Sequence, residues 1–162
     1  MIRQRLGKDL LFFDGGMGTL LQEKGLAPGE LPETWNLTHS EEIYKIHRQY
    51  IEAGSDIILT NTFGANALKF HDDSCSLEEI IKAAVSHVKK AEREALLQTG
   101  DERKIYTALD VGPTGKLLKP MGDLEFETAY EAFKEVVILG EQAGADLIHI
   151  ETMSDTYELK AA

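Results

Sequence analysis

Four short apolar runs of this 162-residue chain end in polar residues that could contact a ligand. The first run, residues 10–13, leads into a carboxylate and a glycine-rich turn. If each run is a buried strand of a parallel sheet, these ends meet at one edge, where ligands bind in α/β folds. The polar residues at the four ends are Asp14, Asn61, Thr62, Asp110 and Glu151.

The turn Asp14-Gly15-Gly16-Met17-Gly18-Thr19 has three glycines within four residues. Glycine lets the backbone bend sharply and approach a ligand closely, so N–H groups near Gly16 and Met17 could hold a substrate carboxylate. Asp14 and Glu151 accept hydrogen bonds when ionised and could together grip an ammonium group. This combination predicts an amino-acid substrate. The alternative is that one or both carboxylates only cap the turn that follows.

Other polar residues have a less specific interpretation. Asn61, Thr62 and Asp110 could orient the same ligand, although polar residues at strand ends often bond only loop backbone. His149, inside the last apolar run, is interpreted as a core residue. The single cysteine, Cys75, and the scattered histidines lack ligand spacing, so no metal site and no catalytic residue are assigned within the chain.

The stretches between the apolar runs predict helices. Thr38 with Glu41, and Ser76 with Glu79, each resemble a capping box at a helix start. Apolar residues at helical spacing follow both, and glycines mark the ends. Trp35 is expected to cover one end of the core. The expected helices cover residues 19–24, 38–54, 76–100 and 126–144, and the expected strands cover 10–13, 56–62, 105–109 and 146–151.

Strands alternating with helices, and too apolar to face water, predict right-handed parallel units in an α/β sheet or a (β/α)8 TIM-type barrel. Residues 154–162 read as the start of a further helix with no ending signal. We therefore expect residues 1–162 to be one half-barrel of about four β/α units, truncated within the fourth helix. Its open strand edges and apolar inner face would favour self-association.

Composition narrows the class of partner. The chain has 17 basic and 28 acidic residues, a formal net charge of −11, which disfavours nucleic acid and anionic membranes. No stretch approaches the ~20 apolar residues of a membrane span, and a signal-peptide core is missing. A single cysteine excludes an internal disulfide framework, so a cytoplasmic location is expected.

Four segments together resemble the homocysteine S-methyltransferase family, and within it the homocysteine-binding barrel of cobalamin-dependent methionine synthase. Each segment alone is a weak signal, but the four occur in order at four strand ends. The resemblance spans nearly the whole chain. The segments are Asp14-Gly15-Gly16-Met17-Gly18-Thr19, Leu59-Thr60-Asn61-Thr62-Phe63-Gly64-Ala65-Asn66, Gly112-Pro113-Thr114-Gly115 and Ile150-Glu151-Thr152-Met153-Ser154-Asp155.

The resemblance implies transfer of a methyl group from methylcobalamin to homocysteine, giving methionine, with zinc binding the homocysteine thiol. Asp14 and Glu151 would match substrate-binding acids, and Gly16 with Met17 would lie near the amino-acid carboxylate. The family's zinc ligands are cysteines in the second half of the barrel, so they are expected outside this chain. Cobalamin- and folate-binding modules would be partners within the same enzyme, and the fragment alone is expected to be inactive.

Three alternatives remain open at this point. Related barrels use betaine or S-methylmethionine as the methyl donor, although residues 113–115 and 120–124 look more like the cobalamin-dependent branch. A non-catalytic half-barrel that serves binding or assembly is a second possibility. A phosphate-binding barrel enzyme is a third, which the single Gly-Gly turn supports only weakly.

Overall fold

A parallel three-stranded sheet forms the centre of the computed structural model, which describes residues 2–70, 75–100 and 102–162. The strands are β1 (Ile57–Leu59), β2 (Tyr106–Val111) and β3 (Leu147–Ile150), in the order β1-β2-β3. Ile57 pairs with Tyr106, and Ala108 pairs with Leu147. The predicted α/β class with parallel strands is therefore confirmed.

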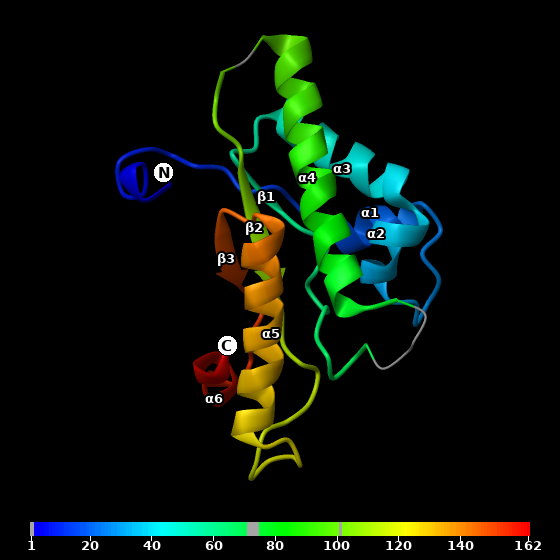
Figure 1. Cartoon of the computed structure of the whole chain (residues 1–162), viewed down its shortest axis with the longest axis vertical. Helices are drawn as coiled ribbons and strands as arrows, with labels where there is room; N and C mark the ends of the chain where they lie inside the picture. Colours follow the sequence, from blue (N-terminus) through cyan, green and yellow to red (C-terminus); the bar gives the residue numbers. More distant parts are fainter. Residues whose placement is uncertain (1, 71–74, 101) are drawn as a thin grey trace.

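Long helices connect the strands and cover one side of the sheet (Figure 1). They are α3 (Ser40–Ala53), α4 (Leu77–Thr99) and α5 (Phe126–Ala143), with α4 packed between the other two. Ile58 packs toward α3 and α4, whereas Leu109 and Val111 pack toward α4 and α5. The shorter elements are η1 (Ile2–Gln4), α1 (Met17–Glu23), η2 (Pro32–Thr34), α2 (Trp35–Thr38) and α6 (Thr156–Ala161).

Local signals explain where α4 begins and where the long helices end. Ser76 Oγ accepts a hydrogen bond from Glu79 N, and the Glu79 carboxylate accepts one from Ser76 N, so the predicted capping box is present. Gly54, Gly100 and Gly144 follow α3, α4 and α5 in left-handed backbone conformations, with φ of 113°, 66° and 96°. Glycine adopts these angles without a steric penalty, so each helix ends there.

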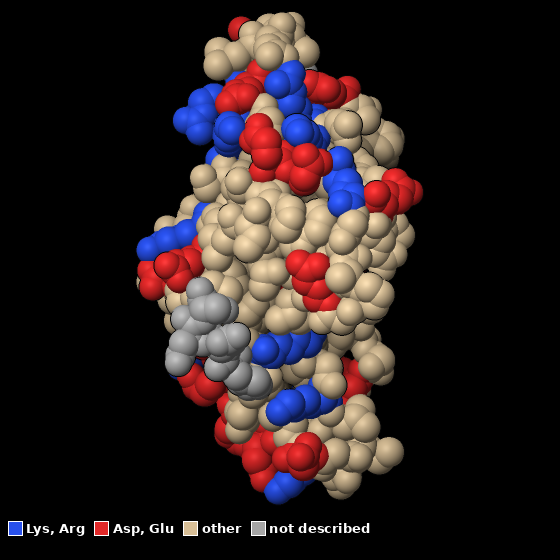
Figure 2. All heavy atoms as spheres, turned by 90° about the vertical axis from the view of Figure 1, so that its right-hand side faces the viewer, with Lys and Arg blue, Asp and Glu red and all other residues tan. Residues whose placement is uncertain are grey.

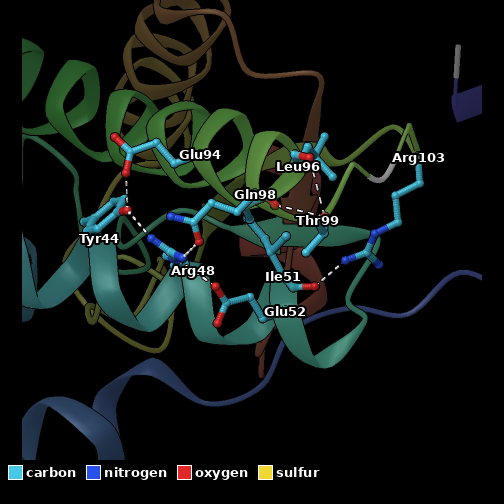
Figure 3. Close-up of polar contacts among 10 residues, drawn as sticks. Tyr44, Arg48, Ile51, Glu52, Glu94, Leu96, Gln98, Thr99 and Arg103 are labelled. Atoms are coloured by element: carbon cyan, nitrogen blue, oxygen red, sulfur yellow. Dashed lines mark hydrogen bonds and ion pairs between the residues drawn. The ribbon is translucent and has the colours of Figure 1, made fainter.

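A polar network joins α3 to α4 on the solvent side of the apolar contacts (Figure 3). Arg48 donates to Glu52 Oε1 at 2.7 Å, to Tyr44 Oη at 3.2 Å and to Gln98. Tyr44 also donates to Glu94 of α4. Arg103 donates to the carbonyl oxygens of Ile51 and Ser55, which helps to satisfy the C-terminal end of α3. These bonds fix the pair of helices that flanks β1.

The inner face of the sheet has its own apolar cluster. Side chains alternate along a strand, so Tyr106, Ala108 and Asp110 of β2 point to the face opposite Leu109 and Val111. Tyr106 and Ala108 pack with Ile57 there. Asp110, further along the strand, lies above this apolar layer at the carboxyl end of the sheet. Partly buried Leu11, Leu59 and Leu147 complete the cluster.

Charges of both signs are mixed on the helical face of the molecule. Figure 2 shows basic and acidic side chains side by side at the upper end of this face and a largely uncharged middle. Arg48–Glu52 and Lys90–Glu41 are two of the ion pairs on α3 and α4. Within the described residues, no helix is both long enough and apolar enough to cross a membrane.

The prediction for residues 10–13 is only partly correct. The run lies parallel to β1, because Phe13 makes an isolated bridge to Ile57 and the Phe12 carbonyl accepts from Ile57 N at 3.0 Å, but it does not continue into a full strand. Nor is the run buried on both faces, because Leu10 is 76% and Phe12 55% exposed. Apolar composition indicated burial, but only Leu11 is partly buried, in the inner apolar cluster. The sheet of the described residues therefore has three strands instead of the four expected.

Three smaller predictions also need correction. Thr38 does not cap the second helix: it ends α2 and donates to Thr34 O at 3.2 Å, and α3 begins at Ser40 without a side-chain cap. β3 was expected to be buried but is only partly so. Tyr130 belongs to the apolar pattern of the helix predicted over residues 126–144 but is 45% exposed; the buried stripe of α5 consists of Ala129, Ala132, Phe133, Val136 and Gly140.

Candidate functional site

A pocket of about 430 Å³ lies at the carboxyl ends of the strands. It brings together the glycine-rich turn, the start of η2, the segment after β1, the end of β2 and the residue after β3. Four of its lining residues carry carboxyl groups, and among the described lining residues there is no Lys, Arg or His. The acids are Asp14, Glu33, Asp110 and Glu151.

Asp14 serves the fold and lines the pocket at the same time. Both of its carboxylate oxygens accept from Leu59 N, at 3.2 and 3.1 Å, so the side chain caps the end of β1. Burial raises the pKa of Asp14 to about 7, against the lowering effect of the Leu59 bond, and the negative charge of Glu151 raises it further. The capping alternative placed this bond in the turn that follows Asp14, whereas the side chain bonds the backbone of β1.

The glycine-rich turn is held against α3 by Tyr50. Its hydroxyl donates to Gly16 O at 3.2 Å. A Cβ on Gly15 would lie only 2.8 Å from the same hydroxyl oxygen, so this close approach requires glycine. α1 starts at Met17, directly after Gly16, and the first N–H groups of a helix have no partner within it. The turn therefore presents backbone donors at the wall of the pocket.

Asp110 is the buried acid at the end of β2. Its backbone is fixed on both sides, because its N–H donates to Thr60 Oγ1 at 3.2 Å and its carbonyl accepts from Thr62 Oγ1 at 2.8 Å. The residue is 6% exposed, and its Oδ1 has no hydrogen-bond partner among the described residues. Burial raises the pKa of Asp110 to about 8, followed in effect by the charge of Glu151 and a hydrogen bond with it.

Glu151 reaches the same pocket from β3. It follows Ile150, the last residue of the strand, and its N–H donates to Val111 O at 3.1 Å, which extends the pairing with β2 by one residue. The next residue, Thr152, has a φ of 55°, a left-handed conformation that a β-branched residue rarely adopts. This turn ends the strand abruptly and leaves the Glu151 side chain at the pocket.

Glu33 is a pocket acid that sequence reasoning missed. It belongs to η2, is 3% exposed, and accepts from Gly64 N through Oε1. Its Oε2 has no hydrogen-bond partner among the described residues. A Cβ on Gly64 would lie 2.6 Å from Glu33 Oε1, so glycine is needed for this contact. A lone glutamate in a proline-flanked loop gives no sequence signal for such burial.

The remaining predicted residues behave differently from one another. Asn61 lines the pocket, but its amide donates to Pro32 O at 2.8 Å. Thr62 is fully buried and does not line the pocket; its hydroxyl bonds the Asp110 carbonyl and lies 2.7 Å from Thr60 Oγ1. Gly16 and Met17 line the pocket as expected from the turn. Thr62 therefore supports Asp110 from behind.

The Gly112–Gly115 segment shapes the wall next to Asp110. Gly112 N donates to Phe63 O at 2.9 Å, and a Cβ there would lie 2.5 Å from the ring of Phe63, which lines the pocket. Thr114 donates to buried Glu158 of α6 through both its N–H, at 2.8 Å, and its hydroxyl, at 2.6 Å. This segment thus positions an aromatic wall and connects it to α6.

Neither Cys75 nor any of the described histidines lines the pocket. His149 packs its ring against Phe13, with centroids 4.9 Å apart, and is only partly buried. His47 is fully buried, and Cys75 forms no disulfide. His71 lies outside the described residues. No group of three or more His, Cys, Asp or Glu in the described part of the chain is placed to hold a metal ion, so these residues do not fit a zinc site.

Comparisons with known proteins agree with this architecture. The chain is 32% identical to the methionine synthases of Mycobacterium leprae (strain TN), over 165 residues, and Mycobacterium tuberculosis (strain ATCC 25618 / H37Rv), over 163 residues. The matches cover 98% and 97% of this chain but only 14% of each relative, so the chain spans about a seventh of the length of these relatives.

Two solved structures show the same fold. The homocysteine methyltransferase MmuM from Escherichia coli superposes with a TM-score of 0.84 in its metallated form and 0.83 in its oxidized form. Sequence identities are 23% and 24%, and the matches cover 99% of this chain and 60% or 59% of MmuM. The described part of the chain therefore has the fold of a portion of that enzyme.

A sequence profile of a protein family identifies the family of this chain. The profile described as homocysteine S-methyltransferase matches residues 11–162, nearly the whole chain. The matched region contains every strand, the glycine-rich turn and all four acids of the pocket. This chain belongs to the homocysteine S-methyltransferase family.

Proposed function

We propose that this chain forms the homocysteine-binding part of a methionine synthase, in which the homocysteine thiol takes a methyl group to give methionine. One observation carries the proposal: residues far apart in the sequence meet in a single acidic pocket at the strand ends, beside the glycine-rich turn that leads into α1. Membership of the homocysteine S-methyltransferase family and the two methionine synthase relatives support it.

The two ends of the amino-acid group of homocysteine have separate partners in this proposal. Glu151 and Asp14 accept hydrogen bonds from the substrate ammonium. Backbone N–H groups of the turn at Gly16 and Met17 bind the carboxylate. The Phe63 ring forms an apolar wall of the same pocket, suited to the methylene groups. Asn61 and Thr62 hold neighbouring backbone and so maintain the shape of the pocket.

We place the remaining functional groups outside these residues. Zinc is proposed to be held by ligands that residues 1–162 do not supply, because the described part of the chain offers no fitting group. Methylcobalamin is the proposed donor, carried with folate-binding modules on other parts of the same enzyme. The chain itself is proposed to be the N-terminal half of a (β/α)8 barrel, which the partial coverage of MmuM supports.

The Glu151→Gln variant tests the substrate-binding role, in the protein of full natural length. Glutamine keeps the shape and removes the charge. A hydrogen bond to a charged group contributes ~1.5–3 kcal/mol, so the dissociation constant for L-homocysteine should rise roughly ten- to a hundredfold. Isothermal titration calorimetry measures the constant, and zinc content is measured in parallel and should not change.

Glu127→Gln is the matched control, since Glu127 lies in the exposed first turn of α5. Unchanged homocysteine affinity in Glu151→Gln, or loss of zinc together with affinity, would contradict the proposed role. The donor is tested by supplying methylcobalamin, betaine or S-methylmethionine in turn and measuring methionine. Methionine formed from betaine or S-methylmethionine alone would exclude the cobalamin-dependent assignment.

A further inference from the structure

Four carboxyl groups share the pocket, which raises the question of how their charge is balanced. No described lining residue is basic. Lys69 and His149 are basic residues on the surrounding elements. Lys69 Nζ lies 3.4 Å from Pro113 O and close to Gly64, on the Glu33 side of the pocket, whereas His149, the register partner of Asp110, packs on Phe13. Several negative charges in one buried space repel one another strongly, so some of these acids hold protons while the pocket is empty.

Asp110 is the acid best placed to hold such a proton. Glu151, Asp14 and Glu33 face it from three other segments, and each of their charges opposes its ionisation. The residue is only 6% exposed, so its carboxylate would have little contact with water. The backbone bonds to Thr60 and Thr62 hold in place the strand end that carries it. A buried carboxyl group beside three other acids keeps its proton more readily than one in water.

The polar atoms left without partners indicate what completes the pocket. Asp110 Oδ1 and Glu33 Oε2 both belong to side chains more than nine-tenths buried that line the pocket, and neither has a hydrogen-bond partner among the described residues. Buried acceptors without donors are costly, so a ligand that brings several N–H donors and a positive charge would satisfy them. An ammonium group has three donors and that charge.

We propose that the Asp110 carboxyl holds a proton while the pocket is empty and that this proton leaves for the solvent when the substrate ammonium binds beside it. The proton passes to water, the Asp110 carboxylate becomes charged, and the ammonium supplies the balancing charge and the hydrogen bonds. Asp110 is thus a third substrate-binding acid, and the exchange selects a cationic amine over a neutral group. This inference rests on the proposed function, because it takes the ligand to be an amino acid.

Calorimetry with two ligands tests the proton release. The protein of full natural length is titrated at pH 7 with L-homocysteine and with 4-mercaptobutanoate, which lacks only the amino group, in buffers of different ionisation enthalpy. A thiol can also lose a proton on binding. Both ligands contain a thiol, so this proton is released equally by both and does not affect the difference between them. L-Homocysteine should release about one proton more per molecule, since a group with a pKa of about 8 is mostly protonated at pH 7.

The Asp110→Asn variant should remove most of this difference, the remainder coming from Asp14, whereas Asp123→Asn, at an exposed position, should retain it in full. The affinity of the unmodified protein for L-homocysteine, relative to 4-mercaptobutanoate, should also rise by up to about tenfold per pH unit between pH 6 and 8. Equal proton release from the two ligands in unmodified protein would overturn the inference and leave homocysteine binding intact. A protein that binds no L-homocysteine would overturn the proposed function and this inference with it.

Discussion

At the residue scale, the buried carboxyl of Asp110 predicts how stability depends on pH. Its folded-state pKa is raised to about 8, above the ordinary 3.8 expected in the unfolded chain. Between pH 3.8 and pH 8 the unfolded state binds fewer protons than the folded state, so the free energy of unfolding falls as pH rises. The stabilising contribution of the Asp110 carboxyl is complete below about pH 4 and is lost as pH rises through 8. Asp110→Asn should therefore be more stable than the unmodified protein at pH 8, by up to several kcal/mol at about 1.4 kcal/mol per pH unit.

Urea unfolding of both proteins at pH 4, 6 and 8 measures this effect. The difference in free energy of unfolding should grow with pH and be close to zero at pH 4. Asp123→Asn, which changes an exposed carboxyl, should show no such trend. A constant difference across the three pH values would mean that folding does not raise the pKa of Asp110.

The sequence predicted the pocket residues that stand at strand ends, because strand direction alone brings them to one edge. Asp14, Asp110 and Glu151 line the pocket for this reason. Thr62 was predicted by the same rule but is buried behind the pocket, since the rule does not say which way a side chain turns. Glu33 was not predicted, because its burial depends on a contact with Gly64, which lies about thirty residues further along the chain.

At the element scale, the structure confirms predictions that rest on local signals. α4 begins after Ser76 and its capping box, and it ends before Gly100, because these motifs act within a few residues of the helix ends. The prediction that residues 10–13 are buried was wrong, because their composition resembles a buried strand whether or not other elements cover them. Long-range packing decides burial, and a single sequence does not show it.

The contact between α6 and the Gly112–Gly115 segment gives a prediction at this scale. Glu158 is 3% exposed and accepts both the N–H and the hydroxyl of Thr114. Glu158→Ala would leave the buried Thr114 N–H without a partner, which costs about 1–3 kcal/mol. Hydrogen exchange of the Thr114 amide, followed by mass spectrometry or NMR, should become faster by roughly ten- to a hundredfold.

Lys160→Ala is the matched control, because Lys160 is an exposed residue of the same helix. It should leave exchange at Thr114 unchanged. Equal protection of Thr114 in Glu158→Ala and in the unmodified protein would show that another group takes over the bonds.

Because Phe63 packs on Gly112, loosening of the Gly112–Gly115 segment in Glu158→Ala should also weaken homocysteine binding.

At the scale of the whole molecule, helices cover one side of the sheet and leave the inner side with little cover (Figure 1). The inner cluster includes partly buried Leu11, Leu59 and Leu147, and β3 has β2 as its only strand partner among the described residues. An open strand edge beside exposed apolar groups favours pairing with another chain. At the other edge of the sheet, beside β1, the exposed apolar residues include Leu10, Phe12 and Phe13.

A polypeptide consisting of residues 1–162 alone should therefore self-associate. Multi-angle light scattering after gel filtration should give a dimer or larger species, in amounts that rise with concentration. Phe12→Glu places a charge on a side chain that is 55% exposed beside β1 and should shift the distribution toward monomer. Leu97→Glu is the control, because Leu97 is 77% exposed on α4, far along the chain from this edge. A concentration-independent monomer that unfolds cooperatively would contradict the prediction, because it would mean that the open face of the sheet is stable in water.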